Sequence, residues 1–240
     1  MPPSVLSQSL LSARAIEDTA QRWDAWSEAV GIVRIGHDFD ALSAQAWVTF
    51  CRTLRGLRAK LPEPRRLELR RASNEELRSA LQNLQDRRSI DQSSFYAWHE
   101  QTMASLARVW QGESDVVTKS ESQTFPLTLG QRQKWLNILI KFIIALGEAG
   151  PFPDFRFRVR SFAHVPIDNI VYSMLRNASD VPVGESTVAL EFRNGKYSTW
   201  SRMSNIACYA RFQRLWRDFC APSGAYPADV ELLAWDVLSQ

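Results

Sequence analysis

The sequence predicts a mainly α-helical protein, and three observations carry that prediction. Apolar residues recur at helical spacing along most of the chain. Proline, glycine and capping residues bound the periodic segments. Hydrophobic residues make up 45% of the 240 residues, enough for a substantial core. We expect a single globular domain, 1–240, in which two helical lobes, about 1–115 and 125–240, flank a cleft.

Each helix expected in the first half has a recognisable start or stop. One or two helices cover residues 4–30, and an amphipathic helix covers 39–60 and ends before Pro62. The motif Ser73-Asn-Glu-Glu76 has the form of a capping box and predicts a helix from there to about 85. A further helix is expected over 91–111.

The second half begins with a polar stretch, 112–123, which we expect to be a surface loop. Pro126-Leu-Thr-Leu-Gly130 predicts a hairpin-like entry into an apolar helix that ends near Gly147. Residues 150–165 are expected to form an extended loop. The remaining expected elements are a helix over 168–177 with Asp168 as N-cap, a small β-hairpin near 187–198 around Asn194-Gly195, a helix from Thr199 to about 219, and a helix over 227–238.

Composition argues against several classes of protein. The three cysteines form no CxxC pair and the three histidines are scattered, so we expect reduced thiols, no catalytic metal and no cofactor. The N-terminal segment lacks the basic and apolar regions of a signal peptide, and the longest apolar stretch is too short to span a bilayer. We therefore expect a soluble, cytoplasmic monomer without a membrane partner.

The charge is mildly basic, with a net charge of +3 and a pI of about 8.9. The basic residues gather in two clusters, one over 52–71 and one in the RFRVR run at 156–160. The first fits either a solvated helix face or a phosphate-binding surface. The second fits either a strand or a nucleic-acid contact.

The most informative segment is the apolar helix QKWLNILIKFIIAL at 133–146, which carries two of the five lysines of the chain. Lys134 and Lys141 are seven residues apart, so they lie within roughly 20° of each other on one helix face. Asn137 falls beside them. An amine held against apolar surface is costly to ionise and can act as a nucleophile.

Further along the chain, His164-Val-Pro-Ile-Asp168 precedes another helix. A turn with glycine, a lysine at the start of an apolar helix and a Pro-x-Asp helix start, in this order, resemble the helix-hairpin-helix DNA glycosylases. The pattern is most similar to the archaeal 8-oxoguanine DNA glycosylase (AGOG) branch and its bacterial relatives. The resemblance covers about 127–175, a fifth of the chain.

This resemblance implies a two-lobed helix-hairpin-helix glycosylase fold that flips a modified base out of double-stranded DNA. It implies Lys134 or Lys141 as the nucleophile at the sugar C1′, with Asp168 stabilising the cationic sugar or activating the nucleophile. The residues expected to contact the base are Gln133, Asn137, Pro166, Trp200 and Tyr209. The residues expected to contact DNA are Gly130, Arg132, Arg156, Arg158 and Arg160.

Two features depart from the family pattern. The segment before the lysine helix lacks the glycine-rich L-P-G-V-G form, so fewer backbone amides can approach a phosphate. Lys134 and Asp168 are 34 positions apart in the sequence, a long separation for the superfamily, because of the insertion at 150–165.

The modified base remains open: an oxidised purine and a hypermodified cytosine of phage DNA both fit, the first in repair and the second in defence. A nucleic-acid-binding protein that keeps this fold without the chemistry is the alternative. A helical interaction module without nucleic acid is a third interpretation, in which Asp168 is only an N-cap and Lys134 a solvated lysine.

Overall fold

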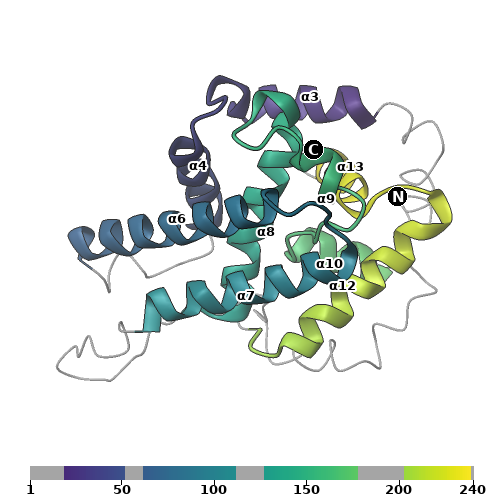
Figure 1. Ribbon diagram of the computed structural model, residues 1–240. Helices are drawn as coiled ribbons and strands as arrows, with labels where there is room; N and C mark the ends of the chain where they lie inside the picture. The colour runs from purple at the N-terminus through teal and green to yellow at the C-terminus, as the bar shows by residue number, and fades with distance from the viewer. Residues whose placement is uncertain (1–18, 52–61, 112–126, 178–202, 239–240) are drawn as a thin grey trace.

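The computed structural model describes residues 19–51, 62–111, 127–177 and 203–238, and these segments contain helices and no strand (Figure 1). The helical class is therefore confirmed. The elements are α3 (Thr19–Ala29), η1 (Ile32–Arg34), α4 (Phe39–Cys51), α6 (Glu63–Gln85), α7 (Gln92–Gln111), α8 (Leu129–Leu146), η3 (Gly147–Ala149), α9 (Phe155–Val159), α10 (Asn169–Asn177), α12 (Ile206–Cys220), η5 (Ala221–Ser223) and α13 (Pro227–Leu238). The β-hairpin expected near 187–198 and the loop expected at 112–123 lie outside the described residues.

Helix α8 runs through the centre of the molecule and packs against α3, α4, α7 and α9 (Figure 1). Every residue from Gln133 to Leu146 is buried, as expected for a helix that is apolar on nearly all sides. The helix begins at a complete capping box, in which Thr128 Oγ1 accepts from the Gln131 amide and Gln131 Oε1 accepts from the Thr128 amide. It ends at Gly147, whose φ of 52° suits glycine.

Aromatic side chains join α8 to its neighbours. The indole of Trp135 lies 4.7 Å from Trp47 and stacks on Phe50 at 5.8 Å between ring centroids. Trp47 stacks in turn on Trp110 of α7. Most tryptophans were expected in the core, and among those whose side chains the structure describes only Trp26 is not buried. No helix in the described segments is long and apolar enough to cross a membrane.

The capping box expected at Ser73 is wrong, because α6 runs unbroken from Glu63 to Gln85 after Pro62. Leu69, Leu77, Leu81 and Leu84 continue one buried face through this point. The Ser73 hydroxyl lies on that face, where it accepts a hydrogen bond from the Trp110 indole at 3.0 Å. Burial on a continuous helix face has overridden the local motif.

Three other boundaries differ from the expectation. Gly130 was expected to end a hairpin-like turn, but it lies buried in the first turn of α8 and its amide donates to the Met203 carbonyl. The expected extended loop at 150–165 contains the short helix α9. Helix α12 begins at Ile206 rather than near Thr199, since Asn205 is the N-cap and accepts from two amides.

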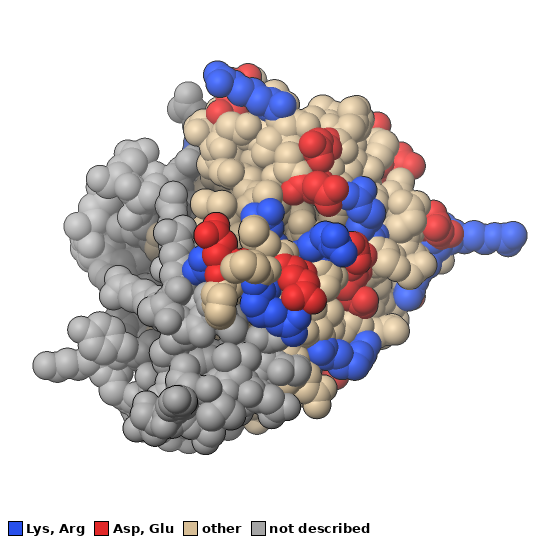
Figure 2. Space-filling view, turned by 90° about the vertical axis from the view of Figure 1, so that its left-hand side faces the viewer, with Lys and Arg blue, Asp and Glu red and all other residues tan. Residues whose placement is uncertain are grey.

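The basic cluster at 52–71 is described only from residue 62 onwards. There Arg65 pairs with Glu68 at 2.7 Å and Arg71 with Glu75 at 3.4 Å, both along exposed α6. Figure 2 shows acidic and basic side chains interspersed over the described part of one face. For this part of the cluster, the pairing favours a solvated helix face over a phosphate-binding surface.

Candidate active site

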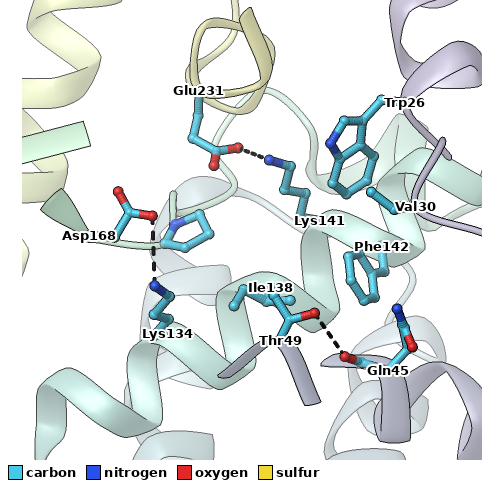
Figure 3. Close-up of a pocket in the computed structure, with 11 residues that line it drawn as sticks. Trp26, Val30, Gln45, Thr49, Lys134, Ile138, Lys141, Phe142, Asp168 and Glu231 are labelled. Atoms are coloured by element: carbon cyan, nitrogen blue, oxygen red, sulfur yellow. Dashed lines mark hydrogen bonds and ion pairs between the residues drawn. The ribbon is translucent and has the colours of Figure 1, made fainter. Parts of the chain in front are cut away.

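The structure brings Lys134 and Asp168 together. Lys134 Nζ lies 3.7 Å from Asp168 Oδ2, and both side chains are nearly buried, with relative exposures of 11% and 6% (Figure 3). Lys134 is in the second turn of α8, whereas Asp168 immediately precedes α10. A buried ion pair costs desolvation energy, so it is weak evidence for a purely stabilising role.

Asp168 is held by the start of α10. Its Oδ1 accepts from the amides of Ile170 at 2.9 Å and Val171 at 3.1 Å, which makes it the N-cap that the sequence predicts. With Oδ1 fixed in this way, Oδ2 is the oxygen that faces Lys134. The cap therefore sets the direction of the carboxylate.

A second ion pair lies deeper along α8. Lys141 Nζ is 2.6 Å from Glu231 Oε2 on α13, and both side chains are buried. The same ammonium lies 4.6 Å from the centre of the Trp26 ring, a cation–π distance. Figure 3 shows the two pairs side by side.

Both pairs line a pocket of about 510 Å³ (Figure 3). This volume is within the usual range for small-molecule sites. The first half of the chain contributes one wall from α3 and α4, and the second half contributes α8, residues 166–168 and α13. The lining residues are Trp26, Val30, Gln45, Thr49, Lys134, Ile138, Lys141, Phe142, Pro166, Asp168 and Glu231.

Burial shapes the electrostatics of the pocket. Desolvation lowers the pKa of Lys134, against the opposing attraction of Asp168 and of Glu231. Desolvation raises the pKa of Glu231, although Lys141 opposes that shift. The pocket thus combines an amine that is unusually easy to deprotonate with a carboxyl that is unusually easy to protonate.

Three residues expected to contact a base lie behind the pocket instead of on its wall. Gln133, Asn137 and Tyr209 are fully or almost fully buried. Asn137 lies 2.7 Å from His99 Nε2, and the Tyr209 hydroxyl lies 2.8 Å from His164 Nδ1. These residues form a polar network under residues 164–168. Of the other two expected residues, Pro166 lines the pocket and Trp200 lies outside the described residues.

Three of the four arginines expected to contact DNA, Arg132, Arg158 and Arg160, have hydrogen-bond partners in the protein. Arg132 donates to the Met103 carbonyl at 2.8 Å. Arg158 donates to the carbonyls of Gln85 and Arg87, and Arg160 forms two hydrogen bonds to Asp229 of α13. The half-buried Arg156 packs against Gly147, and its buried Nε and Nη2 have no hydrogen-bond partner among the described residues. Arg158 and Arg160 therefore anchor the run at 156–160 to neighbouring segments, and Phe157 is its exposed apolar side chain.

The most important residue that sequence reasoning missed is Glu231. It stands in the apolar sequence VELLAW of α13, and an acidic residue in an apolar helix is the same signal that identified the lysines. Trp26 and Gln45 gave no such signal, because their place on the pocket wall depends on how α3 and α4 pack against α8.

Within the described residues, no group of three or more histidine, cysteine or acidic side chains is placed to hold a metal ion.

Comparisons with protein-family models, with curated proteins and with solved structures give no significant match. The function therefore has to be argued from the chemistry of this pocket.

Proposed function

We propose that this protein is a DNA glycosylase that excises a modified base through the Lys134–Asp168 pair. The observation that carries the proposal is the pair itself: an amine whose pKa is lowered by burial faces a fixed carboxylate oxygen at 3.7 Å in a pocket. A lysine at the start of an apolar helix and an aspartate at a Pro-x-Asp helix start are also the two elements of the resemblance to helix-hairpin-helix glycosylases.

Base excision requires the target nucleotide to leave the stack and enter a pocket. Lys134 Nζ, as a neutral amine, then forms a bond to the sugar C1′ while the glycosidic bond breaks. The base leaves with the bonding electron pair and takes up a proton. Asp168 stabilises the positive charge that develops on the sugar and can accept the proton that the attacking amine loses.

Lys134 is the better nucleophile of the two lysines. Lys141 is in short contact with Glu231 and lies over the Trp26 ring, so attack by Lys141 would break a 2.6 Å ion pair. The Lys134–Asp168 contact is longer, at 3.7 Å, and includes the carboxylate that the chemistry needs. Lys141 and Glu231 instead supply a donor and an acceptor for the polar edge of a base in the pocket.

Apolar and aromatic walls complete a site suited to a planar heterocycle. Phe142 and Trp26 lie 5.7 Å apart between ring centroids and both line the pocket. Aromatic surface and a few polar groups are the usual means of holding a flipped base. An oxidised purine and a hypermodified cytosine remain the two candidate substrates.

Borohydride trapping tests this proposal. Attack by Lys134 followed by opening of the sugar ring gives a Schiff base, which borohydride reduces to a stable protein–DNA adduct. We expect an adduct with a duplex that carries the right modified base, and we expect Lys134→Ala to abolish it while Lys141→Ala retains it. Because an enzyme that uses water gives no adduct, free base is measured in parallel. DNA binding with neither adduct nor free base would favour the non-enzymatic alternative.

A further inference from the structure

Residues 165–167, which lead into Asp168, are held by side chains instead of by a neighbouring strand. Gln133 Oε1 accepts from the Ile167 amide at 3.1 Å, and Gln133 Nε2 donates to the Ile167 carbonyl at 3.2 Å. Gln213 of α12 makes the equivalent pair of bonds to Val165, at 3.0 and 2.8 Å. Two glutamine amides thus take the place of a strand partner for alternate residues.

The sequence of this segment fits that arrangement. In an extended chain, backbone groups of alternate residues point to the same side. Val165 and Ile167 direct theirs to the glutamines, whereas Pro166, between them, has no amide hydrogen to satisfy on the opposite side. Pro166 and Asp168 themselves line the pocket.

Gln133 also adjoins the other member of the candidate catalytic pair. It precedes Lys134 on α8, and Ile167, its partner, precedes Asp168. The Gln133 amide is fixed at its own end as well, because Nε2 donates to the Gly130 carbonyl at 2.9 Å and Oε1 accepts from Asn137 at 3.1 Å. One buried side chain therefore connects the residues that flank both groups.

We propose that Gln133 is a positioning residue that sets the separation between Lys134 Nζ and Asp168 Oδ2, with Gln213 as the second attachment of the same segment. Its importance for base excision rests on the proposed function, but its control of the Lys134–Asp168 separation does not. A buried polar side chain is costly unless its donors and acceptors are hydrogen-bonded. Those of Gln133 are all hydrogen-bonded, and two of these bonds fix the backbone that leads into Asp168.

The decisive measurement is the electrostatic coupling between the Lys134 amine and the Asp168 carboxylate, which is read from the pKa of Lys134. With 13C-labelled lysine side chains, NMR titration gives the pKa of Lys134, whose signal is assigned from the spectrum of Lys134→Arg; only five lysines contribute. The shift in that pKa caused by Asp168→Asn is measured in the wild-type background and again in Gln133→Met. Coulomb attraction varies inversely with distance, so lengthening the 3.7 Å separation by about 1 Å lowers it by about a fifth, and we expect the shift in Gln133→Met to be smaller by at least that fraction.

Gln131→Met is the matched control, because it makes the same substitution two residues earlier on α8 and removes a capping contact instead. We expect it to leave the coupling unchanged. If Gln133→Met does not fold, Gln133→Asn keeps the amide but shortens its reach by one methylene, and the same decrease is expected. Full wild-type coupling in a folded Gln133 variant would overturn the proposal.

The rate of base excision gives a second measurement, which is independent of the NMR titration. Under single-turnover conditions at saturating DNA, we expect Gln133→Met to slow base release on the order of 100-fold, the usual effect of displacing a reacting group by about 1 Å. DNA affinity should change by less than about threefold, since Gln133 is fully buried behind the pocket. Equal losses of affinity and rate would contradict positioning. If the wild-type protein releases no base, the proposed function fails, and the titration still decides the role of Gln133.

Discussion

Two buried histidines make the stability of this protein sensitive to acid. His99 and His164 are 4.6 Å apart between ring centroids and both contact the Tyr209 hydroxyl. Burial lowers the pKa of His99 from its ordinary 6.5 to about 4, partly opposed by its hydrogen bond to Asn137. Burial and then the proximity of His99 lower the pKa of His164 in the same direction.

The direction of the effect follows from proton linkage. Because the folded state holds these histidines neutral, the unfolded chain binds protons more readily, and stability falls as the pH drops below 6.5. For His99 alone, a folded pKa of about 4 against 6.5 corresponds to about 3 kcal/mol once the pH is below both values. Between pH 7 and pH 5 the loss is about 2 kcal/mol.

Urea unfolding followed by tryptophan fluorescence measures this loss at a series of pH values. Carboxyl groups also titrate in acid and contribute to every variant. The informative quantity is therefore the difference between variants in the slope of the unfolding free energy against pH. We expect His99→Gln to be less stable at pH 7, because it disturbs the network, but to lose about 2 kcal/mol less than wild type between pH 7 and pH 5.

Gln213→Met is the control, since it removes hydrogen bonds to residue 165 in the same buried network but no titratable group. We expect this variant to be less stable but to keep the wild-type dependence of the unfolding free energy on pH. If His99→Gln retains the full wild-type slope, the histidine is not held neutral by burial, and the account of the network under residues 164–168 is wrong.

Three further predictions follow from the site. Asp168→Asn and Asp168→Ala both leave the buried Lys134 without its carboxylate, but Asn keeps an oxygen that can cap α10, so Asp168→Ala should be less stable than Asp168→Asn by about 1 kcal/mol in urea unfolding. The single-turnover rate of excision should rise with pH as Lys134 loses its proton and should level off at a lower pH than the 10.5 of an ordinary lysine, because burial lowers its pKa. Arg160→Ala should cost about 2–3 kcal/mol in urea unfolding, because it leaves the buried Asp229 carboxylate without its cation.

Sequence reasoning singled out the lysine and the aspartate that the structure pairs, because both elements have strong local signals. Two lysines in an otherwise apolar helix and an aspartate at a proline-marked helix start remain recognisable without knowledge of packing. Their distance, and the pairing of Lys141 with Glu231, depend on how α8, α10 and α13 meet. No local pattern encodes that arrangement.

The structure places Gln133 and Asn137 away from the pocket wall for a geometric reason. Successive residues on a helix are about 100° apart, so Gln133 and Lys134 face different directions, whereas Gln133 and Asn137 share a face about 40° wide. The lysine face borders the pocket, and the amide face holds residues 165–167. The polar residues of this helix therefore form two faces. Lys134 and Lys141 face the pocket, and Gln133 and Asn137 bind the segment 165–167.

Release of free base is the measurement that tests the central claim most directly. The wild-type protein, Lys134→Met and Asp168→Asn are incubated with three duplexes, one carrying 8-oxoguanine, one carrying a glucosylated hydroxymethylcytosine and one unmodified, and the released base is quantified by mass spectrometry. We expect the wild-type protein to release one modified base and both variants to lose that release while retaining DNA binding. Undiminished release by either variant, or no release from any duplex that the protein binds, would contradict the account.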